Sequence, residues 1–165
     1  MIEYTLYIII FIICLILSGF FSGSEVALFS ITRAKVRTLV NEKVHGAEAL
    51  AALKKDPDNF LITILIGNNI VNILAASVAT AIAIGIFGET GIAVSVATIV
   101  VVLLLLVFGE IWPKMYASRN SSSFSLRFSP VILLLSKLFY PVVFIFNKLA
   151  GKMTGGSPFT HHMIT

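Results

Sequence analysis

Two long stretches without any lysine or arginine constrain this chain more than any other feature of its sequence. The first runs over residues 1–32 and the second over residues 56–113. Of the 165 residues, 58% are hydrophobic and only 12% are charged, whereas soluble domains carry about 25% charged residues. We therefore expect an integral membrane protein whose environment is the lipid bilayer, and not a protein that binds nucleic acid.

Within these stretches, three segments are long enough to cross a membrane. A bilayer core about 30 Å thick is crossed by about 20 apolar residues in a helix. Residues 4–29, 59–87 and 91–112 meet that requirement, and the last two are separated by a short turn at residues 88–91. The predicted fold class is an all-α membrane protein with three transmembrane helices.

The positions of the basic residues predict how these helices are oriented. All 12 lysines and arginines lie in residues 33–55, in residues 114–127, or in and just after the last apolar segment. Because positive charge marks the cytoplasmic side, we expect an extracellular N-terminus, a cytoplasmic C-terminus and a multi-pass protein of the cell membrane. Residues 33–55 then form a cytoplasmic helical hairpin, with helices at 33–44 and 47–55 separated by His45-Gly46. Asp56 is expected to cap the second span, with Pro57 in its first turn.

A fourth apolar segment, residues 130–150, is the ambiguous part of this topology. Lys137 and Pro141 lie near its middle, and a lysine at the bilayer centre costs about 2.5–3.5 kcal/mol. We expect a juxtamembrane helix in the cytoplasmic interface, begun by Ser129-Pro130, although a fourth span stays open. Its predicted interfacial anchors are Phe139, Tyr140, Phe144 and Phe146. The membrane domain is expected to cover residues 1–152, followed by a linker or tail at 153–165.

Polar residues inside the three predicted spans indicate a site for a hard cation. Ser18 and Ser22 are one helical turn apart on the first span, and Asn68 and Asn72 are one turn apart on the second. The third span carries Gly109 and Glu110 four and three residues before Pro113. Because proline lacks an N–H, the carbonyl of Gly109 loses its helical donor. The six candidate metal ligands offer only oxygen atoms, which suit Mg²⁺, Na⁺ or Ca²⁺; they are Ser18, Ser22, Asn68, Asn72, Gly109 and Glu110.

Each of these features also has a simpler structural interpretation. The pattern Ser18-Gly19 and Ser22-Gly23 is typical of closely packed membrane helices, and the asparagines can act as interhelical hydrogen-bond partners. Glu110 can pair with Lys114, four residues further on. The cation-site hypothesis depends on all three spans contributing oxygen atoms at once.

Three sequence strings resemble the transmembrane domain (DUF21 type) of the CNNM/CorC family of magnesium transporters. They are Ser18–Glu25 (SGFFSGSE), Ile66–Asn72 (IGNNIVN) and Phe108–Lys114 (FGEIWPK), and the resemblance extends over residues 6–152. It implies a homodimer that holds dehydrated Mg²⁺ between its helices and exports it in a Na⁺-dependent manner. The family's ion-binding positions map onto the same six residues.

The resemblance also defines what else we expect. Family members usually continue into cytosolic CBS domains, and this chain stops where those domains would begin, so we expect them to be absent from it. The predicted function is Mg²⁺ transport by alternating access. The alternative is a Mg²⁺-sensing membrane regulator of another transporter. We expect no enzyme, because all three histidines lie outside the spans and no span carries an aspartate pair. A nonselective channel is disfavoured by the clustering of so many ligands.

Overall fold

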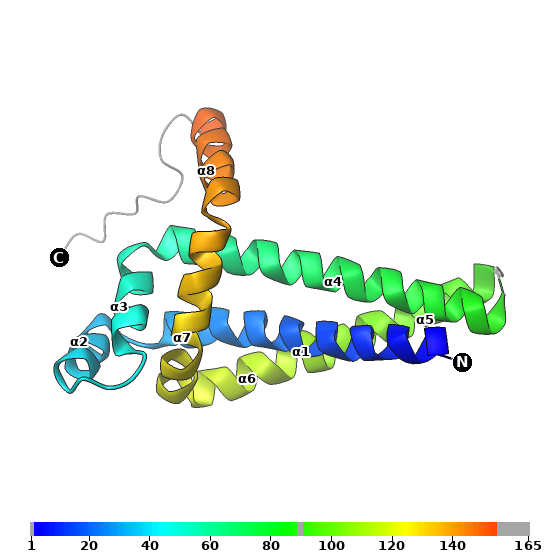
Figure 1. The fold of residues 1–165 in the computed structure, drawn as a ribbon, viewed down its shortest axis with the longest axis horizontal. Helices are drawn as coiled ribbons and strands as arrows, with labels where there is room; N and C mark the ends of the chain where they lie inside the picture. Colours follow the sequence, from blue (N-terminus) through cyan, green and yellow to red (C-terminus); the bar gives the residue numbers. More distant parts are fainter. Residues whose placement is uncertain (1, 89–90, 155–165) are drawn as a thin grey trace. The chain divides into compact units, whose positions relative to one another are not determined.

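Every regular element in the described part of the chain, residues 2–88 and 91–154, is a helix (Figure 1). The coordinates are those of a computed structural model. The elements in chain order are α1 (Ile2–Ser30), α2 (Arg33–Asn41), α3 (Ala47–Lys55), α4 (Pro57–Phe87), α5 (Gly91–Leu104), the π-helical segment η1 (Leu105–Ile111), α6 (Trp112–Arg119), α7 (Ser121–Leu138) and α8 (Tyr140–Thr154).

Three helical segments are each long and apolar enough to cross a membrane, as predicted. They are Tyr4–Ser30, Pro57–Phe87 and Gly91–Arg119. The third is longer than predicted because α5, η1 and α6 follow one another without a break. The bent pair Ser121–Leu138 and Tyr140–Leu149 passes the same test only when taken together, so the fourth span stays open. Gly88 ends the second span with a positive φ of 78°, while the rest of the predicted turn, residues 89–90, lies outside the described residues. The direction in which each span crosses stays a prediction.

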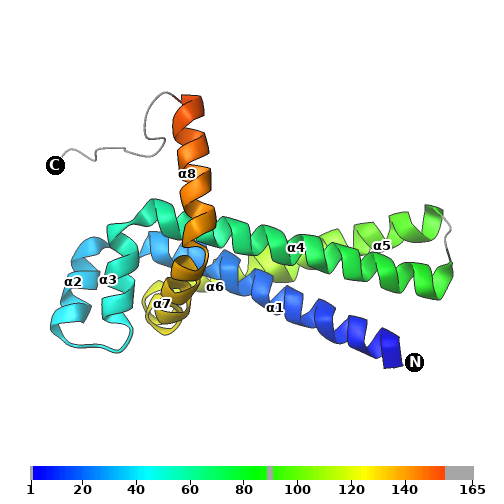
Figure 2. The same ribbon diagram turned by 45° about the horizontal axis from the view of Figure 1, so that its top comes forward.

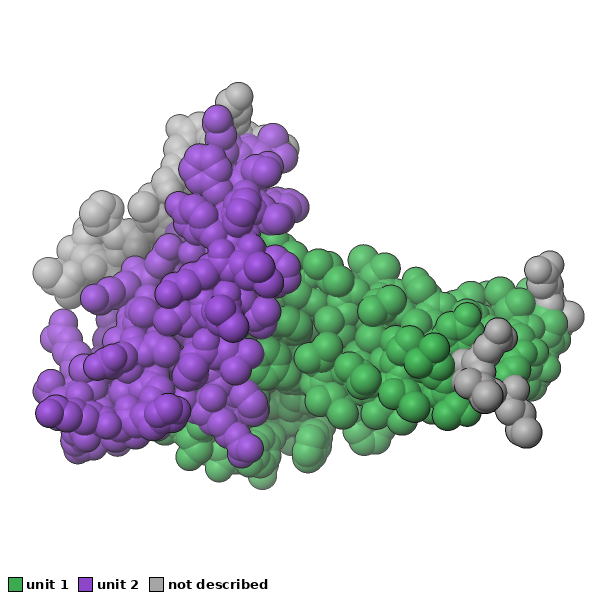
Figure 3. Space-filling view, viewed as in Figure 1, with its two compact units in different colours: residues 1–32, 64–125 green, residues 33–63, 126–165 purple. Residues whose placement is uncertain are grey.

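The chain divides into two compact units, coloured separately in Figure 3. The first comprises Met1–Thr32 and Ile64–Ser125, and the second comprises Arg33–Thr63 and Leu126–Thr165. The first unit contains most of the three spans, and within it α1 runs along η1 and α6 (Figure 2). The predicted tail, residues 155–165, lies outside the described residues.

Glycines allow the helices of the first unit to approach each other closely. A Cβ atom at Gly67 on α4 would collide with the ring of Phe21 on α1. A Cβ atom at Gly23 on α1 would lie 2.8 Å from the ring of Phe124. Small residues commonly have this role where membrane helices cross. The packing interpretation of the glycines therefore holds, and it does not exclude a separate role for the serines beside them.

The third span changes its helical register just before Pro113. Over η1 the backbone is π-helical, and at its end the N–H of Trp112 donates to the carbonyl of Val107, five residues earlier. The prediction for Gly109 assumed α-helical spacing, in which position 113 faces the carbonyl of residue 109. At π-helical spacing position 113 faces the carbonyl of Phe108, so the missing proline donor leaves the Phe108 carbonyl free, and the free carbonyl of Gly109 stays a prediction. π-Helical turns are rare in proteins as a whole, and those that occur often lie at functional sites.

The second unit contains the two predicted short helices. Helix α3 has the predicted bounds, whereas α2 ends at Asn41, three residues earlier than predicted. Buried Val36 and Leu39 from α2 and buried Leu50 and Leu53 from α3 give each helix one apolar face. Each helix alone is only 9 residues long, and such short helices need tertiary packing to be stable.

Gly46, between these two helices, has two reasons to be a glycine. Its φ is +84°, a left-handed conformation that side chains with a Cβ adopt at a cost. A Cβ there would also collide with the carbonyl oxygen of Leu126 on α7. That carbonyl has lost its helical donor, because the residue four positions later is Pro130. Pro130 is thus accommodated inside α7, next to the backbone of Gly46.

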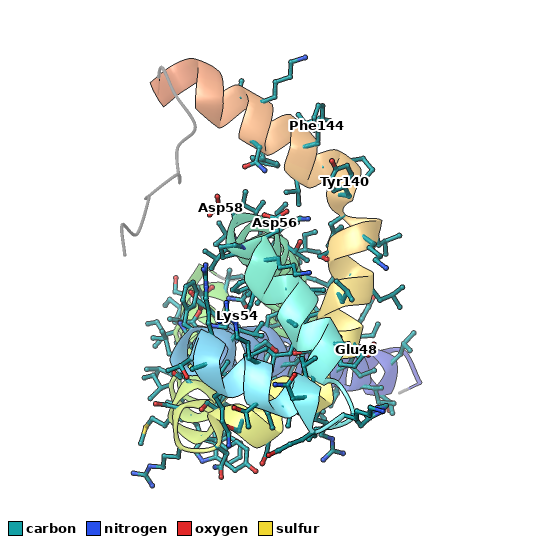
Figure 4. All side chains as sticks on the ribbon, turned by 90° about the vertical axis from the view of Figure 1, so that its left-hand side faces the viewer. Glu48, Lys54, Asp56, Asp58, Tyr140 and Phe144 are labelled. Atoms are coloured by element: carbon teal, nitrogen blue, oxygen red, sulfur yellow. The ribbon has the colours of Figure 1, made fainter. Side chains whose placement is uncertain are left out.

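The prediction of one helix over residues 130–150, begun by Ser129-Pro130, is wrong. Pro130 lies inside α7, which begins at Ser121. The helix is interrupted at Phe139. Helices α7 and α8 meet there at an angle of 66°. Pro141 explains the break, because it lacks the N–H that would bond the carbonyl of Lys137 and its ring would clash with that carbonyl in a continuous helix. Tyr140 and Phe144 on α8 lie exposed with ring centroids 6.4 Å apart (Figure 4), in keeping with the anchor role expected of them.

The start of the second span agrees with the prediction. The carboxylate of Asp56 accepts a hydrogen bond from the N–H of Asn59 at 3.3 Å, and Pro57 is the first helical residue. This is the N-cap arrangement expected from the sequence Asp56-Pro57-Asp58.

Candidate cation site

Four of the six predicted ligand positions meet within the first unit. The hydroxyl oxygen of Ser18 on α1 lies 2.8 Å from the amide oxygen of Asn72 and 3.2 Å from that of Asn68, both on α4. It lies 3.4 Å from the carbonyl oxygen of Gly109 on η1. The three predicted spans therefore each contribute an oxygen atom to one cluster.

Both asparagines turn the amide oxygen, and not the N–H groups, towards Ser18, so in this arrangement only the Ser18 proton can connect the cluster. Ser18 has a single O–H to donate, and it faces three oxygen atoms that only accept. O–H···O hydrogen bonds are usually about 2.5–3.0 Å long, so the contact to Asn72 has the geometry of a hydrogen bond. The contacts to Asn68 and Gly109 are longer and leave oxygen atoms facing each other. A cation among them would relieve that repulsion.

Ser22 lies one helical turn from Ser18 and has an unsatisfied hydroxyl. Its side chain is 1% exposed, and among the described residues its oxygen has no hydrogen-bond partner. Burying a hydroxyl without a partner costs about 1–3 kcal/mol. Serines in membrane helices normally avoid that cost by donating to the carbonyl four residues earlier, as Ser24 does to Phe20 at 2.6 Å. Ser22 is therefore free to bind a ligand.

Gly109 is required in the cluster because of space. A Cβ atom there would lie 2.8 Å from the hydroxyl oxygen of Ser18 and 3.2 Å from its Cβ. Any larger residue would separate η1 from α1 and remove the backbone carbonyl from the cluster. The π-helical turn and the glycine together bring this carbonyl to Ser18.

Phe108 has a free backbone carbonyl close to α1, and this residue is not among the predicted ligand positions. Its carbonyl oxygen lies 3.4 Å from the position of a Cβ atom on Gly19, next to Ser18. The helical donors to this carbonyl are lost, because Trp112 donates to Val107 and Pro113 has no N–H. Pro113 signals that a carbonyl lacks its helical donor. No local sequence pattern marks the π-helical register that places Phe108 opposite Pro113.

Glu110 follows Gly109 but is not part of the oxygen cluster through any contact in the structure. Its side chain is half-buried. Lys114, the partner considered for it, instead forms an ion pair with Glu25 on α1 at 3.4 Å, with both side chains 41% exposed. Across the described residues Glu110 makes neither an ion pair nor a hydrogen bond. A carboxylate on a membrane span without a partner is costly and marks a functional position.

The cluster differs from common transition-metal sites in its ligand types. In the described part of the chain, no three His, Cys, Asp or Glu residues lie close enough to hold a metal ion together. The cluster instead offers hydroxyl, amide and backbone oxygens, and the carboxylate-bearing Glu110 follows Gly109 in the sequence. Such ligands suit hard cations.

Comparison with known proteins relates the chain to one family of membrane domains. The model of the cyclin M (CNNM) transmembrane N-terminal domain matches residues 9–165. A UPF0053 protein of Haemophilus influenzae is 41% identical over 143 residues, covering 87% of this chain and 33% of that protein. The UPF0053 inner membrane protein YfjD of Escherichia coli is 33% identical over 137 residues, covering 83% of this chain and 32% of YfjD.

A further relative comes from a plant. A chloroplastic DUF21 domain-containing protein of Arabidopsis thaliana is 37% identical over 126 residues, covering 76% of this chain and 19% of that protein. The chain thus spans about a third or less of the length of these relatives. From the extent of the match and the three spans, the chain belongs to the CNNM transmembrane-domain family and is a multi-pass membrane protein.

Proposed function

We propose that the oxygen cluster around Ser18 binds a dehydrated Mg²⁺ ion and that the chain carries this ion across the membrane. The observation that carries the proposal is the single proton of Ser18 among three accepting oxygens. The buried hydroxyl of Ser22, which has no partner among the described residues, supports it independently. The six proposed ligand positions are Ser18, Ser22, Asn68, Asn72, Gly109 and Glu110.

The spacing of the oxygens agrees with the size of Mg²⁺. In an octahedral site with Mg–O distances of about 2.1 Å, neighbouring ligand oxygens lie about 3.0 Å apart. The three distances from Ser18 are 2.8, 3.2 and 3.4 Å. Oxygens around Ca²⁺ or Na⁺, at about 2.4 Å from the ion, would lie about 3.4 Å apart. The measured distances cover both expected spacings, so a site that binds Mg²⁺ and also accepts Na⁺ is compatible with them.

The charge of the site is suited to transport. Glu110 is the only ionised ligand in the proposed set, so it supplies most of the attraction for a divalent ion. Neutral oxygens complete the coordination without holding the ion strongly. A carrier must release its ion on the other side, and one carboxylate gives an affinity modest enough for release.

Transport across the membrane requires the site to be reached from each side in turn. We propose alternating access, in which the α1, α4 and η1 segments separate on one side of the cluster at a time. Only 6% of the most apolar part of the third span is buried within this chain. A homodimer would cover part of that surface, since three spans are few to surround a path. Na⁺ entering from outside would compete for the same oxygens and drive Mg²⁺ export.

Flux through purified protein in liposomes tests the proposal. We expect Mg²⁺ efflux that depends on an opposing Na⁺ gradient and is lost in Glu110→Gln, with Glu25→Gln as a control that removes a carboxylate outside the cluster. Efflux that is equal in Glu110→Gln and wild type would refute the proposed site.

A Mg²⁺-sensing regulator of another transporter is the second candidate function, since the same oxygen cluster would serve a sensor. The liposome assay separates the two. A sensor would bind Mg²⁺ with the same dependence on Glu110 and Asn72, yet the purified protein would move no Mg²⁺ in either direction.

A further inference from the structure

A basic cleft between α2 and α3 has no role in the cation site. It is a cavity of about 340 Å³ within the second unit, lined by Arg33, Val36 and Arg37 from α2 and by Ala51, Lys54 and Lys55 from α3. Pockets for small ligands and headgroups usually have volumes of about 300–1,000 Å³. This cleft is therefore large enough for a small anionic group.

Four of the six residues that line the cleft are cations, and none is an acid. Over the residues that the structure describes, none of the four forms an ion pair with a carboxylate. The acid of α3, Glu48, is near the start of that helix, whereas Lys54 is near its end (Figure 4). Asp56 follows the cleft in sequence, but its carboxylate accepts the N–H of Asn59. Within residues 2–88 and 91–154, the cations of the cleft are thus not paired with a carboxylate.

This arrangement opposes the stability of the isolated chain. Arg33 and Arg37 are four residues apart on one face of α2, where like charges destabilise a helix. Arg33 is also the first residue of α2, and the dipole of a helix disfavours a cation at its N-terminus. Burial, and after it the charge of Arg33, lower the pKa of Lys54 below its ordinary value of 10.5. A bound anion would offset all three effects.

Two simpler explanations account for part of the cleft. Lys54 and Lys55 lie in the last turn of α3, where cations favour the helix dipole. Basic residues in general favour the cytoplasmic side of a membrane protein. Neither explanation accounts for Arg33 at the unfavourable end of α2, nor for a cavity enclosed by all four cations.

The position of the cleft in the sequence indicates the source of the anion. Arg33 is the third residue after Ser30, where the first span ends, and Lys55 is the second residue before Pro57, where the next span begins. Cations next to membrane spans attract anionic lipids, with about 1 kcal/mol for each lysine or arginine. We propose that the α2–α3 cleft binds the phosphate of an anionic phospholipid headgroup.

The test compares thermal unfolding and lipid binding of the whole protein in nanodiscs of phosphatidylcholine, with and without phosphatidic acid. Phosphatidic acid is expected to raise the Tm of the wild type. In Arg37→Gln/Lys54→Gln the affinity for phosphatidic acid should fall about 30-fold, from two lost cations. Arg37→Lys/Lys54→Arg retains both charges and should bind like the wild type.

A matched control separates the cleft from general surface charge. Lys35→Gln/Lys43→Gln removes the same charge from the same segment, but neither lysine lines the cleft. Equal losses of affinity in the cleft variant and in this control would overturn the proposal, because they would show diffuse attraction only.

Soluble pyrophosphate in phosphatidylcholine nanodiscs distinguishes the source of the phosphate. No rise in Tm with pyrophosphate, together with a rise with phosphatidic acid, supports the lipid. A rise with pyrophosphate equal to that with phosphatidic acid, lost in the cleft variant, would overturn the lipid assignment in favour of a soluble phosphate ligand.

Discussion

Lys114 on α6 forms an ion pair with Glu25 on α1 at 3.4 Å, although Glu110 lies only four residues before it on the same span. The pair assigns the nearby lysine to Glu25 and leaves Glu110 without a cation among the described residues. The two carboxylates therefore have different expected roles. Glu25 and Lys114 link two spans, and Glu110 remains to interact with a transported ion.

Replacing these two carboxylates should have unequal effects on Mg²⁺ binding. We expect Glu110→Gln to weaken binding by more than about 100-fold. This loss exceeds the one caused by removing a residue that only orients a metal ligand. Glu25→Gln removes an exposed ion pair, which contributes about 0–1 kcal/mol, and should leave binding within a few-fold of wild type. Calorimetry in detergent measures both. Similar losses in the two variants would mean that net charge, rather than a defined ligand, attracts the ion.

The asparagines of α4 provide a control within one helix. Asn72→Ala removes the amide oxygen nearest Ser18 and should weaken Mg²⁺ binding by about 10-fold or more. Asn69→Ala changes an exposed neighbour outside the oxygen cluster and should leave binding unchanged. If Asn72→Ala instead lowers the Tm and leaves binding intact, then Asn72 only connects helices.

Adding charge at the same position should separate binding from transport. Asn72→Asp keeps the shape of the side chain and replaces an amide oxygen with a carboxylate. More charged ligands tighten divalent sites, so we expect Mg²⁺ affinity to rise by about 10-fold and the rate of Mg²⁺ efflux to fall as release slows. Parallel calorimetry and liposome flux test this, and a rise in both quantities would contradict it.

Much of this architecture could be predicted because a membrane restricts the choices. The length and apolarity of the three spans follow from bilayer thickness, and Asp56-Pro57 is a local capping signal that needs no tertiary context. The clustering of Ser18, Asn68 and Asn72 followed from polar residues repeated at helical spacing on neighbouring spans.

The remaining features depend on contacts that a local pattern does not encode. Pro130 reads as a helix start, yet it lies inside α7, and the Leu126 carbonyl that it leaves free lies beside Gly46, which is far away in sequence. Pro113 signals a free carbonyl, but only the π-helical register determines that Phe108 is the residue affected. The position of the Glu110 carboxylate relative to the cluster also stays a prediction.

Gly109→Ala should disrupt the cation site through space alone. The added Cβ would lie 2.8 Å from the hydroxyl oxygen of Ser18, so η1 and α1 must move apart. A displacement of this kind in a positioned site can cost about 100-fold in rate. Gly91→Ala is the matched control, since nothing lies within 4 Å of its added Cβ. Equal Mg²⁺ efflux from both variants in liposomes would show that the Gly109 carbonyl does not need its place beside Ser18.

Gly46→Ala and Gly88→Ala together separate backbone strain from collision. Both glycines have positive φ, +84° and +78°, and alanine in that conformation costs about 1–2 kcal/mol. Gly88 has no atoms near its added Cβ, whereas at Gly46 the Cβ would also collide with the carbonyl oxygen of Leu126. We expect Gly88→Ala to lower the Tm slightly and Gly46→Ala to lower it clearly more. Equal shifts in thermal unfolding would mean that Gly46 and Leu126 do not pack closely.

The lowered pKa of Lys54 predicts a pH-dependent effect on stability. Burial and the charge of Arg33 disfavour the charged form in the folded protein, so the unfolded chain holds this proton more tightly. Below the lowered pKa, Lys54 is charged in both states and the destabilisation is complete. As the pH rises from the lowered pKa towards 10.5, the folded state loses the proton first and stability increases. Lys54→Gln should therefore raise the Tm at neutral pH in phosphatidylcholine alone, and its advantage over wild type should shrink as the pH approaches 10.5. Lys148→Gln, an exposed position on α8, controls for the loss of one charge, and an equal rise in Tm for that variant would show that the cleft does not strain Lys54.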